Sequence, residues 1–156
     1  MNTAVDPAMP LIQRFIDDLP FNQLVGLQLF LDDSGSYAVR FSNDDNLTGN
    51  PLFKTLHGGM IATAMDVAGA LPVLKTLVDR QIAQGKNIAD LGLKTLARAF
   101  TIDLKVDYLR PGKGKHFICR GTLRHLAIQI AFTDMELYNE RDVLIARATG
   151  TYLLGS

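Results

Sequence analysis

The chain has 156 residues, and its 16 basic and 16 acidic residues give it no net charge at pH 7. A neutral chain offers no broad electrostatic attraction to nucleic acid or to an anionic membrane, so we expect neither as a partner. The length is typical of a single domain spanning residues 1–156. The one cysteine, Cys119, excludes an intrachain disulfide and a multi-cysteine metal site, and its alternating apolar surroundings predict a core residue.

The N-terminal segment, residues 1–10, has no basic stretch followed by an apolar run, so no signal peptide is predicted. The most apolar stretch, residues 56–71, contains Asp66 and stops at Pro72. We expect it to fall short of the ~20 residues that span a bilayer. The prediction is a cytoplasmic protein without membrane insertion.

The N-terminal third combines a helix and a hairpin. Residues 8–19 have apolar side chains at helical spacing, which predicts a short amphipathic helix that Pro20 ends. The period then changes to two, and the runs Val25–Leu31 and Tyr37–Ser42 flank a turn-forming segment, which predicts a β-hairpin. Residues 43–55 are expected to form a polar loop.

Residues 56–71 predict a long central helix. Their apolar positions recur at spacings of one, three and four, which is typical of a helix buried on most of its circumference (Met60, Ile61, Ala64, Met65, Ala68 and Leu71). Pro72 is expected to kink or end the buried part, and residues 73–80 can continue it. Gln81–Ala97 shows no clear period, which predicts a loop with at most a short helical turn, lying over the surface or an entrance.

The C-terminal third is predicted to be β-structure. Four long alternating segments follow one another with turns between them: Phe100–Tyr108, His116–Leu126, Ala127–Asn139 and Val143–Leu154. The fold class expected from this order is α+β, with an antiparallel sheet of about six strands wrapped around one long central helix and a short N-terminal helix.

The central helix also carries the candidate chemistry. Asp66 is a lone carboxylate in an apolar helix, and Gly58 and Gly59 leave the first helical N–H groups uncovered, where they can polarise a carbonyl. Gly59 and Asp66 are seven residues apart, which places them on one face but roughly 10 Å apart. Two antiparallel copies of the helix across a two-fold axis would bring them together in two composite sites. A structural acid that bonds to a neighbouring backbone group is the alternative for Asp66.

Three segments together resemble a known family. Gly49-Asn50-Pro51, then Leu56-His57-Gly58-Gly59 with Asp66 nine residues after His57, and the strand end Val106-Asp107-Tyr108-Leu109-Arg110-Pro111-Gly112 are similar to the PaaI-type hotdog thioesterases. The similarity runs from about residue 43 to residue 152. The resemblance implies a hotdog fold, a homodimer with a continuous sheet that can pair into a homotetramer, and hydrolysis of acyl-CoA thioesters. It implies no metal or redox cofactor, with CoA present only as part of the substrate.

The resemblance also assigns roles to residues. Asp66 matches the catalytic carboxylate, a general base or nucleophile, and Gly59 matches the position whose N–H polarises the thioester carbonyl. His57 and Asn50 match residues that shape the oxyanion site, and Thr101 matches a hydroxyl that orients the attacking water. Simpler interpretations remain open: His57 as a helix cap, Asn50 as a turn residue, Thr101 as an ordinary strand residue.

Other side chains are assigned to substrate binding. Arg110, Lys113 and Arg124, the last beside His125, can meet the phosphates of CoA, although solvated turn and strand-end positions are the alternative. Phe53, Met60 and Met65 line either the acyl tunnel or the core. Two features depart from the family pattern: Lys54, where the loop usually has glycine, and the long segment 81–97.

Two alternatives to a thioesterase remain. One is a non-catalytic hotdog protein that binds an acyl thioester or serves as an oligomeric partner, which Asp66 disfavours. The other is a hotdog dehydratase, whose histidine–acid pairing the spacing of His57 and Asp66 does not match. The sequence has no G-x-S-x-G elbow, phosphate-binding loop or dinucleotide fingerprint, and its three histidines have no metal-ligand spacing. The apolar lining favours medium- or long-chain or aromatic acyl groups.

Overall fold

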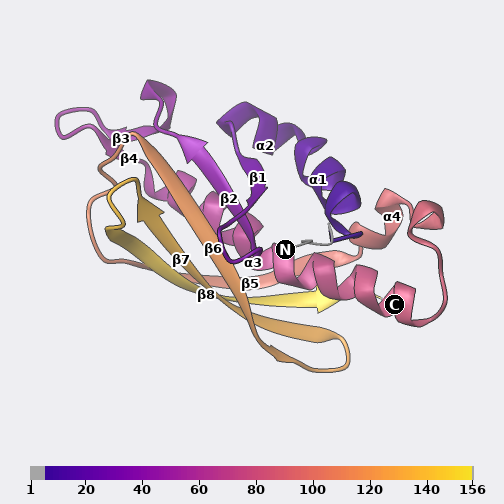
Figure 1. The fold of residues 1–156 in the computed structure, drawn as a ribbon. Coiled ribbons are helices and arrows are strands. Elements are labelled where there is room, and N and C mark those ends of the chain that lie inside the picture. The colour runs from indigo at the N-terminus through magenta and orange to yellow at the C-terminus, as the bar shows by residue number, and fades with distance from the viewer. Residues whose placement is uncertain (1–5, 156) are drawn as a thin grey trace.

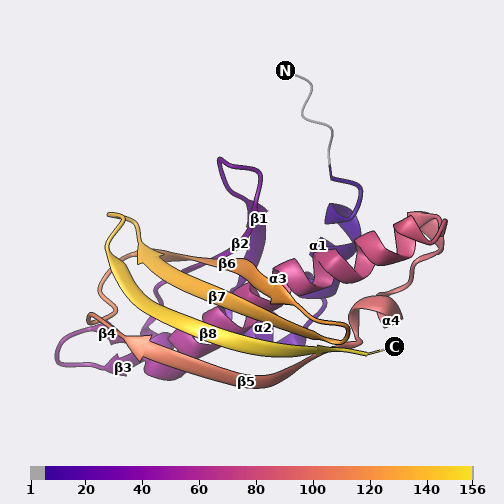
Figure 2. The same cartoon turned by 90° about the horizontal axis from the view of Figure 1, so that it is seen from below.

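A six-stranded antiparallel sheet curls around one long helix in the computed structural model, which describes residues 6–155 (Figures 1 and 2). The strands lie in the order β1 (Gln28–Leu31), β2 (Tyr37–Ser42), β6 (His116–Leu126), β7 (Ile130–Asn139), β8 (Leu144–Leu154) and β5 (Ala99–Tyr108). The central helix, α3 (Gly58–Ala83), crosses the concave face and supplies much of the hydrophobic core. The predicted fold class is confirmed.

The N-terminal segment differs from the prediction at Pro20. Helix α1 (Met9–Asp17) is followed by a second helix, α2 (Pro20–Val25), which Pro20 begins rather than blocks. Proline has no N–H to lose at the first helical position, and its fixed φ suits a helix start. Because α2 ends at Gly26 in the left-handed conformation, β1 starts only at Gln28, so the strand predicted from Val25 begins three residues too early.

The loop over residues 43–55 contains more structure than expected. It forms a 3-10 turn, η1 (Asp45–Leu47), and a small two-stranded sheet of β3 (Thr48–Asn50) and β4 (Thr55–Leu56). Lys54 has a φ of 49°, in the left-handed region that glycine adopts most easily. The loop therefore keeps a glycine-like backbone conformation at the position where the family pattern has glycine.

Pro72 does not end the buried part of the helix: α3 continues to Ala83, and buried residues recur as far as Val78. A proline removes the N–H that would bond to the carbonyl four residues earlier, here that of Ala68. This carbonyl faces Gly121 on β6, where a Cβ would overlap the Ala68 oxygen and lie 2.6 Å from its carbon. The missing side chain of Gly121 thus gives the freed carbonyl the room that an uninterrupted helix requires.

The continuation past Pro72 changes one further expectation. With 26 residues, α3 is long and apolar enough to span a membrane by length and composition, contrary to the expected shortfall. Of its apolar window, however, 56% is buried inside the protein. The helix is therefore the core helix around which the sheet curls.

Gln81–Ala97 is expected to be a loop, with at most a short helical turn, over the surface or an entrance. Most of it is exposed, but residues 81–83 belong to α3 and two of its leucines are buried. After α3 it forms η2 (Ile88–Asp90) and α4 (Leu93–Leu96). Leu91 and Leu96 are 7% and 0% exposed and belong to the main core. These two leucines fasten the segment to the end of the helix layer.

The strands of the C-terminal third agree with the alternation. The β6 strand matches its predicted range residue for residue, while β7 begins at Ile130 because residues 127–129 form the preceding turn. In β5 a bulge between Thr101 and Asp103 shifts the alternation by one position. Thr101 consequently faces α3 together with Leu104 and Val106, although strict alternation would place Thr101 on the opposite face. Cys119 is fully buried, as predicted, and burial raises the pKa of its thiol.

Candidate active site

The Asp66 carboxylate lies half-buried on the side of α3 that faces β5 and β8. One oxygen, Oδ1, accepts a hydrogen bond from the Thr101 hydroxyl at 2.9 Å and a longer one from the Tyr152 hydroxyl at 3.3 Å. Among the described residues, no donor reaches the other oxygen, Oδ2. The carboxylate is therefore held on one side and open on the other, as a base or a nucleophile needs.

Tyr152 is a buried neighbour of Asp66 that the sequence did not indicate. Its side chain is 1% exposed, and its hydroxyl also donates to the main-chain oxygen of Asp66 at 2.9 Å. Burial, followed by the charge of Asp66 and the hydrogen bond to it, raises the pKa of Tyr152. The phenol consequently remains a donor throughout the physiological pH range.

The N-terminus of α3 is capped by its own sequence. His57 is the N-cap, and its Nδ1 accepts a hydrogen bond from the Gly59 N–H at 2.8 Å. The capping role for His57 is confirmed. An Nδ1 that accepts leaves the proton of a neutral imidazole on Nε2, which can act as a donor. A Cβ at position 59 would lie 2.9 Å from Nδ1, so this cap favours glycine there.

The Gly59 N–H expected to polarise a carbonyl is thus already engaged by His57. The neighbouring Gly58 N–H bonds to no described residue, as is usual for the first helical position. The Tyr108 hydroxyl donates to the Gly58 carbonyl oxygen at 3.0 Å, and its ring lies 3.4 Å from where a Gly58 Cβ would be. Tyr108 therefore fixes the peptide that follows the free N–H.

A cavity of about 360 Å³ opens beside this N-terminus. Its lining combines the first turn of α3 with the strand end and turn after β5 (Thr55, Leu56, Gly58, Ile61, Tyr108, Leu109, Arg110, Pro111 and Gly112). The turn needs glycine at position 112 because Leu56 leaves no room for a side chain there: a Cβ at Gly112 would lie 2.7 Å from the Leu56 Cβ. The two motif segments far apart in sequence therefore meet at one cavity.

Asn50 ends β3 and holds the turn that follows, in agreement with its simpler interpretation as a turn residue. Its Oδ1 accepts hydrogen bonds from the Leu52 and Phe53 N–H groups at 3.0 and 3.3 Å. The side-chain amide NH₂ donates to none of the residues that the structure describes. The preceding Gly49 approaches the helix cap closely, because a Cβ added to it would lie 2.7 Å from the His57 Cα. The Asn50 turn therefore lies beside the start of α3.

The residues predicted to bind CoA lie in two places. Arg110 lines the cavity at the α3 N-terminus, where its guanidinium donates to the Leu144 carbonyl, and Lys113 is exposed in the same turn. Arg124 lies near the far end of β6 and forms an ion pair of 2.6 Å with Asp134. The ring of the neighbouring His125 lies 6.1 Å from that of Phe132 on β7, tilted by 32°. One chain therefore does not bring Arg124 to the cavity.

The structure also separates the acyl-lining candidates. Met60 and Met65 are core residues, 5% and 0% exposed, whereas Phe53 is 65% exposed in the β3–β4 loop. The part of the chain that the structure describes contains no group of three or more His, Cys, Asp or Glu side chains that could hold a metal.

Within one chain, the sequence-predicted residues form two groups. Asp66 and Thr101 are joined by a hydrogen bond, and His57, Gly59 and Asn50 gather at the helix start. The two groups are separated along α3, as the seven-residue spacing requires. Tyr108 belongs to one of the family-like motifs, so its place at the site had a signal in the sequence, whereas Tyr152 had none.

Comparisons with known proteins identify the family. The family model for the thioesterase superfamily matches residues 53–146. The medium/long-chain acyl-CoA thioesterase YigI of Salmonella typhimurium is 37% identical over 144 residues, which cover 92% of this chain and 90% of that protein. A Shewanella oneidensis protein related to the thioesterase superfamily has a crystal structure with a TM-score of 0.83 and 35% identity, over 96% of this chain and 97% of that one.

The structure of Escherichia coli PaaI, from the phenylacetic acid degradation operon, shares the fold with a TM-score of 0.70. It is 17% identical, over 96% of this chain and 94% of that one. The resemblance noted in the sequence and the predicted enzyme class are thereby confirmed. The chain belongs to the thioesterase superfamily and is a hotdog-fold thioester hydrolase.

Proposed function

We propose that this protein hydrolyses medium- or long-chain acyl-CoA thioesters to the free acid and CoA, with Asp66 as the reacting carboxylate. The observation that carries the proposal is the state of Asp66: Oδ1 is held by Thr101 and Tyr152, and Oδ2 is free of intramolecular donors among the described residues. The names of the acyl-CoA thioesterase relatives support this choice of substrate. Aromatic acyl groups stay a second choice to be tested.

The oxyanion donor that the geometry supports best is the Gly58 N–H. The Gly59 N–H is engaged by His57, whereas the Gly58 N–H bonds to none of the described residues and lies at the positive end of the α3 dipole, beside a cavity. The Asn50 amide and the Nε2–H of His57, both beside the start of α3, are further candidate donors for the same oxygen. We expect the thioester carbonyl to lie in this cavity with its oxygen on Gly58.

Asp66 would act in one of two ways. As a general base, it takes a proton from water while the water oxygen attacks the carbonyl carbon, and the N–H donor stabilises the negative oxygen. Collapse of the tetrahedral intermediate breaks the C–S bond, and the CoA thiolate takes the proton from Asp66. As a nucleophile, the carboxylate attacks the carbonyl carbon and expels the CoA thiolate, which leaves a mixed anhydride. Water then cleaves the anhydride to the free acid and the Asp66 carboxyl group, and the proton of that carboxyl group goes to the thiolate.

The complete site would need two copies of the chain. Gly58 and Asp66 are eight residues apart on one helix, or roughly 12 Å, which is too far for both to reach one carbonyl group. Strand β5 is an edge strand of ten residues with exposed Phe100 and Ile102, and such edges invite pairing. Antiparallel pairing of two β5 strands would make a continuous sheet and place Gly58 of each chain near Asp66 of its partner.

Arg110 and Lys113 would then meet the phosphates of CoA at the rim of the cavity. Both belong to the turn after β5, next to Gly58. Arg124 is a weaker candidate because Asp134 already neutralises it. The proposal predicts that Arg110→Gln and Lys113→Gln raise KM for acyl-CoA while Arg124→Gln changes it less.

The test is release of free thiol from a panel of short-, medium-, long-chain and aromatic acyl-CoAs. Wild type is compared with Asp66→Asn, which keeps the shape of the side chain but removes its charge. The matched control is Asp79→Asn, the same change on the same helix at an exposed ion pair with Lys75. We expect a loss of at least ~100-fold in kcat for Asp66→Asn and wild-type rates for the control.

Light scattering on the same samples measures the oligomeric state. Ile102→Lys on the β5 edge should yield monomers with little activity, because each site would lose half its residues. Equal rates for wild type and Asp66→Asn would remove Asp66 from the chemistry. Tight binding of acyl-CoA without turnover by any variant would instead indicate a binding protein.

A further inference from the structure

The Tyr152 hydroxyl meets Asp66 at two atoms. It lies 2.9 Å from the Asp66 main-chain oxygen and 3.3 Å from the carboxylate Oδ1. A phenol has one proton, so the main-chain oxygen and the carboxylate oxygen share it. The hydrogen bond to the carboxylate is the stronger one when Asp66 is ionised.

The position of this hydroxyl is set by packing on three sides. A Cβ at Gly69 on α3 would overlap the hydroxyl oxygen, and one at Gly150 on β8 would lie 3.1 Å from it. A Cβ at either glycine would also come within 3.1 Å of the Met135 side chain on β7. Because side chains are missing at Gly69 and Gly150, the tyrosine reaches across the core to α3 and stops at Asp66.

The register of the sheet explains why two hydroxyls reach one oxygen. Thr101 on β5 and Tyr152 on β8 are direct cross-strand partners, so their side chains stand next to each other on the face that meets α3. Both donate to Oδ1. Two donors on one oxygen restrict rotation of the carboxylate about its Cβ–Cγ bond.

We propose that Tyr152 is a positioning residue, which together with Thr101 fixes Oδ1 of Asp66 and directs Oδ2 toward the reacting atoms. The inference rests on the proposed thioesterase function. Tyr152 itself is buried behind the carboxylate and does not reach the cavity at the α3 N-terminus. Its loss should therefore lower kcat and leave KM for acyl-CoA nearly unchanged.

Tyr152→Phe tests this because it removes the hydroxyl and keeps the ring. The expected result is a fall in kcat of about 10-fold, with KM within about two-fold of wild type.

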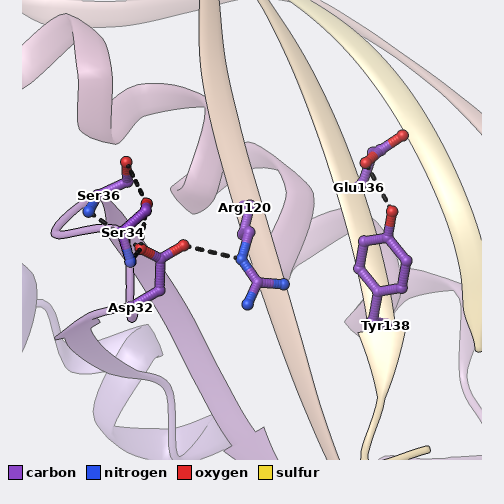
Figure 3. Close-up of polar contacts among 6 residues, drawn as sticks. All are labelled: Asp32, Ser34, Ser36, Arg120, Glu136 and Tyr138. Atoms are coloured by element: carbon purple, nitrogen blue, oxygen red, sulfur yellow. Dashed lines mark hydrogen bonds and ion pairs between the residues drawn. The ribbon is translucent and has the colours of Figure 1, made fainter. Parts of the chain in front are cut away.

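The matched control is Tyr138→Phe. The Tyr138 hydroxyl also donates to a carboxylate, that of Glu136 at 2.7 Å, but on the sheet face opposite α3 (Figure 3). This variant should keep wild-type kcat. Gly69→Ala is the second test variant, because its methyl group displaces the Tyr152 hydroxyl without removing it, and it should show the same selective loss of kcat.

The outcomes separate the two proposals. An active wild type with unchanged kcat in folded Tyr152→Phe or Gly69→Ala overturns the positioning role and leaves the thioesterase proposal standing. A wild type that turns over no acyl-CoA overturns the thioesterase proposal, and the positioning role with it. A variant whose KM rises while kcat is unchanged also contradicts positioning, since it would place Tyr152 in substrate binding.

Discussion

Thr101 and Tyr152 stand directly opposite each other on β5 and β8, and their hydroxyls converge on one oxygen of Asp66. The bulge next to Thr101 makes this convergence possible, because it turns the threonine to the helix face. The orientation of the Asp66 carboxylate therefore depends on one hydroxyl group from each of the two strands.

Thr101→Val should lower kcat about 10-fold, because valine keeps the β-branched shape but cannot donate to Asp66 at all. Thr101→Ser keeps a hydroxyl and should retain most of the activity. Steady-state kinetics on one acyl-CoA measures both. Thr149→Val, an exposed threonine on β8, serves as control. Equal losses in the valine and serine variants would contradict the role of the hydroxyl.

Gly58→Pro should abolish the proposed oxyanion donor while preserving the helix. Proline is favoured at the first helical position, and His57 before it has the extended φ and ψ of −65° and 135° that a following proline requires. We expect kcat to fall by ~100-fold or more. Gly58→Ala keeps the N–H and adds a Cβ in ordinary contact with Tyr108, so it is the control. Activity in the proline variant would exclude the Gly58 N–H as the donor.

Gly121→Ala should destabilise the fold by about 1–3 kcal/mol, since overpacking of a tight core site has costs of this size. The added methyl group would collide with the Ala68 carbonyl, which Pro72 leaves without its helical partner. Urea unfolding followed by circular dichroism gives the free energy of unfolding. Gly92→Ala, where nothing lies within 4 Å of a Cβ, should cost clearly less. A similar loss in both variants would contradict the packing argument.

Asp32 should make stability fall with acid. In the β1–β2 turn its carboxylate accepts hydrogen bonds from the Ser34 hydroxyl, the Arg120 guanidinium and the Ser36 and Ser34 N–H groups (Figure 3). The Ser34 hydrogen bond is the largest cause that lowers the pKa of Asp32 to about 2, with Arg120 next among them. A carboxyl group has a pKa of about 3.9 in the unfolded chain.

Because the pKa of Asp32 is lower in the folded protein than in the unfolded chain, its carboxylate stabilises the fold at pH values above the unfolded pKa. This stabilisation is lost as the pH falls from about 4 to about 2. The difference in unfolding free energy between wild type and Asp32→Asn should be constant near pH 6 and shrink below pH ~4. Urea unfolding at pH 3 to 6 measures it. Asp33→Asn, at the exposed neighbouring carboxylate, provides the comparison. A difference that stays constant down to pH 3 would contradict the prediction.

Local periodicity was sufficient for much of the architecture. The alternation of apolar residues located β2, β5, β6 and β8 almost to the residue, and the apolar spacing of residues 56–71 located the buried part of α3. The helix and strand positions depend on residues close together in sequence, so periodicity was enough to find them. The Gly-Gly start, Asp66 and their seven-residue spacing predict a site whose groups lie about two turns apart on one helix, and this stays a prediction.

Tertiary structure decided what depends on residues far apart in the chain. Pro72 is tolerated inside α3 because Gly121, 49 residues later, leaves room for the Ala68 carbonyl. Tyr152 reaches Asp66 across 86 residues. Neither propensity nor periodicity encodes such contacts, because each exists only when packing brings two distant backbone segments together.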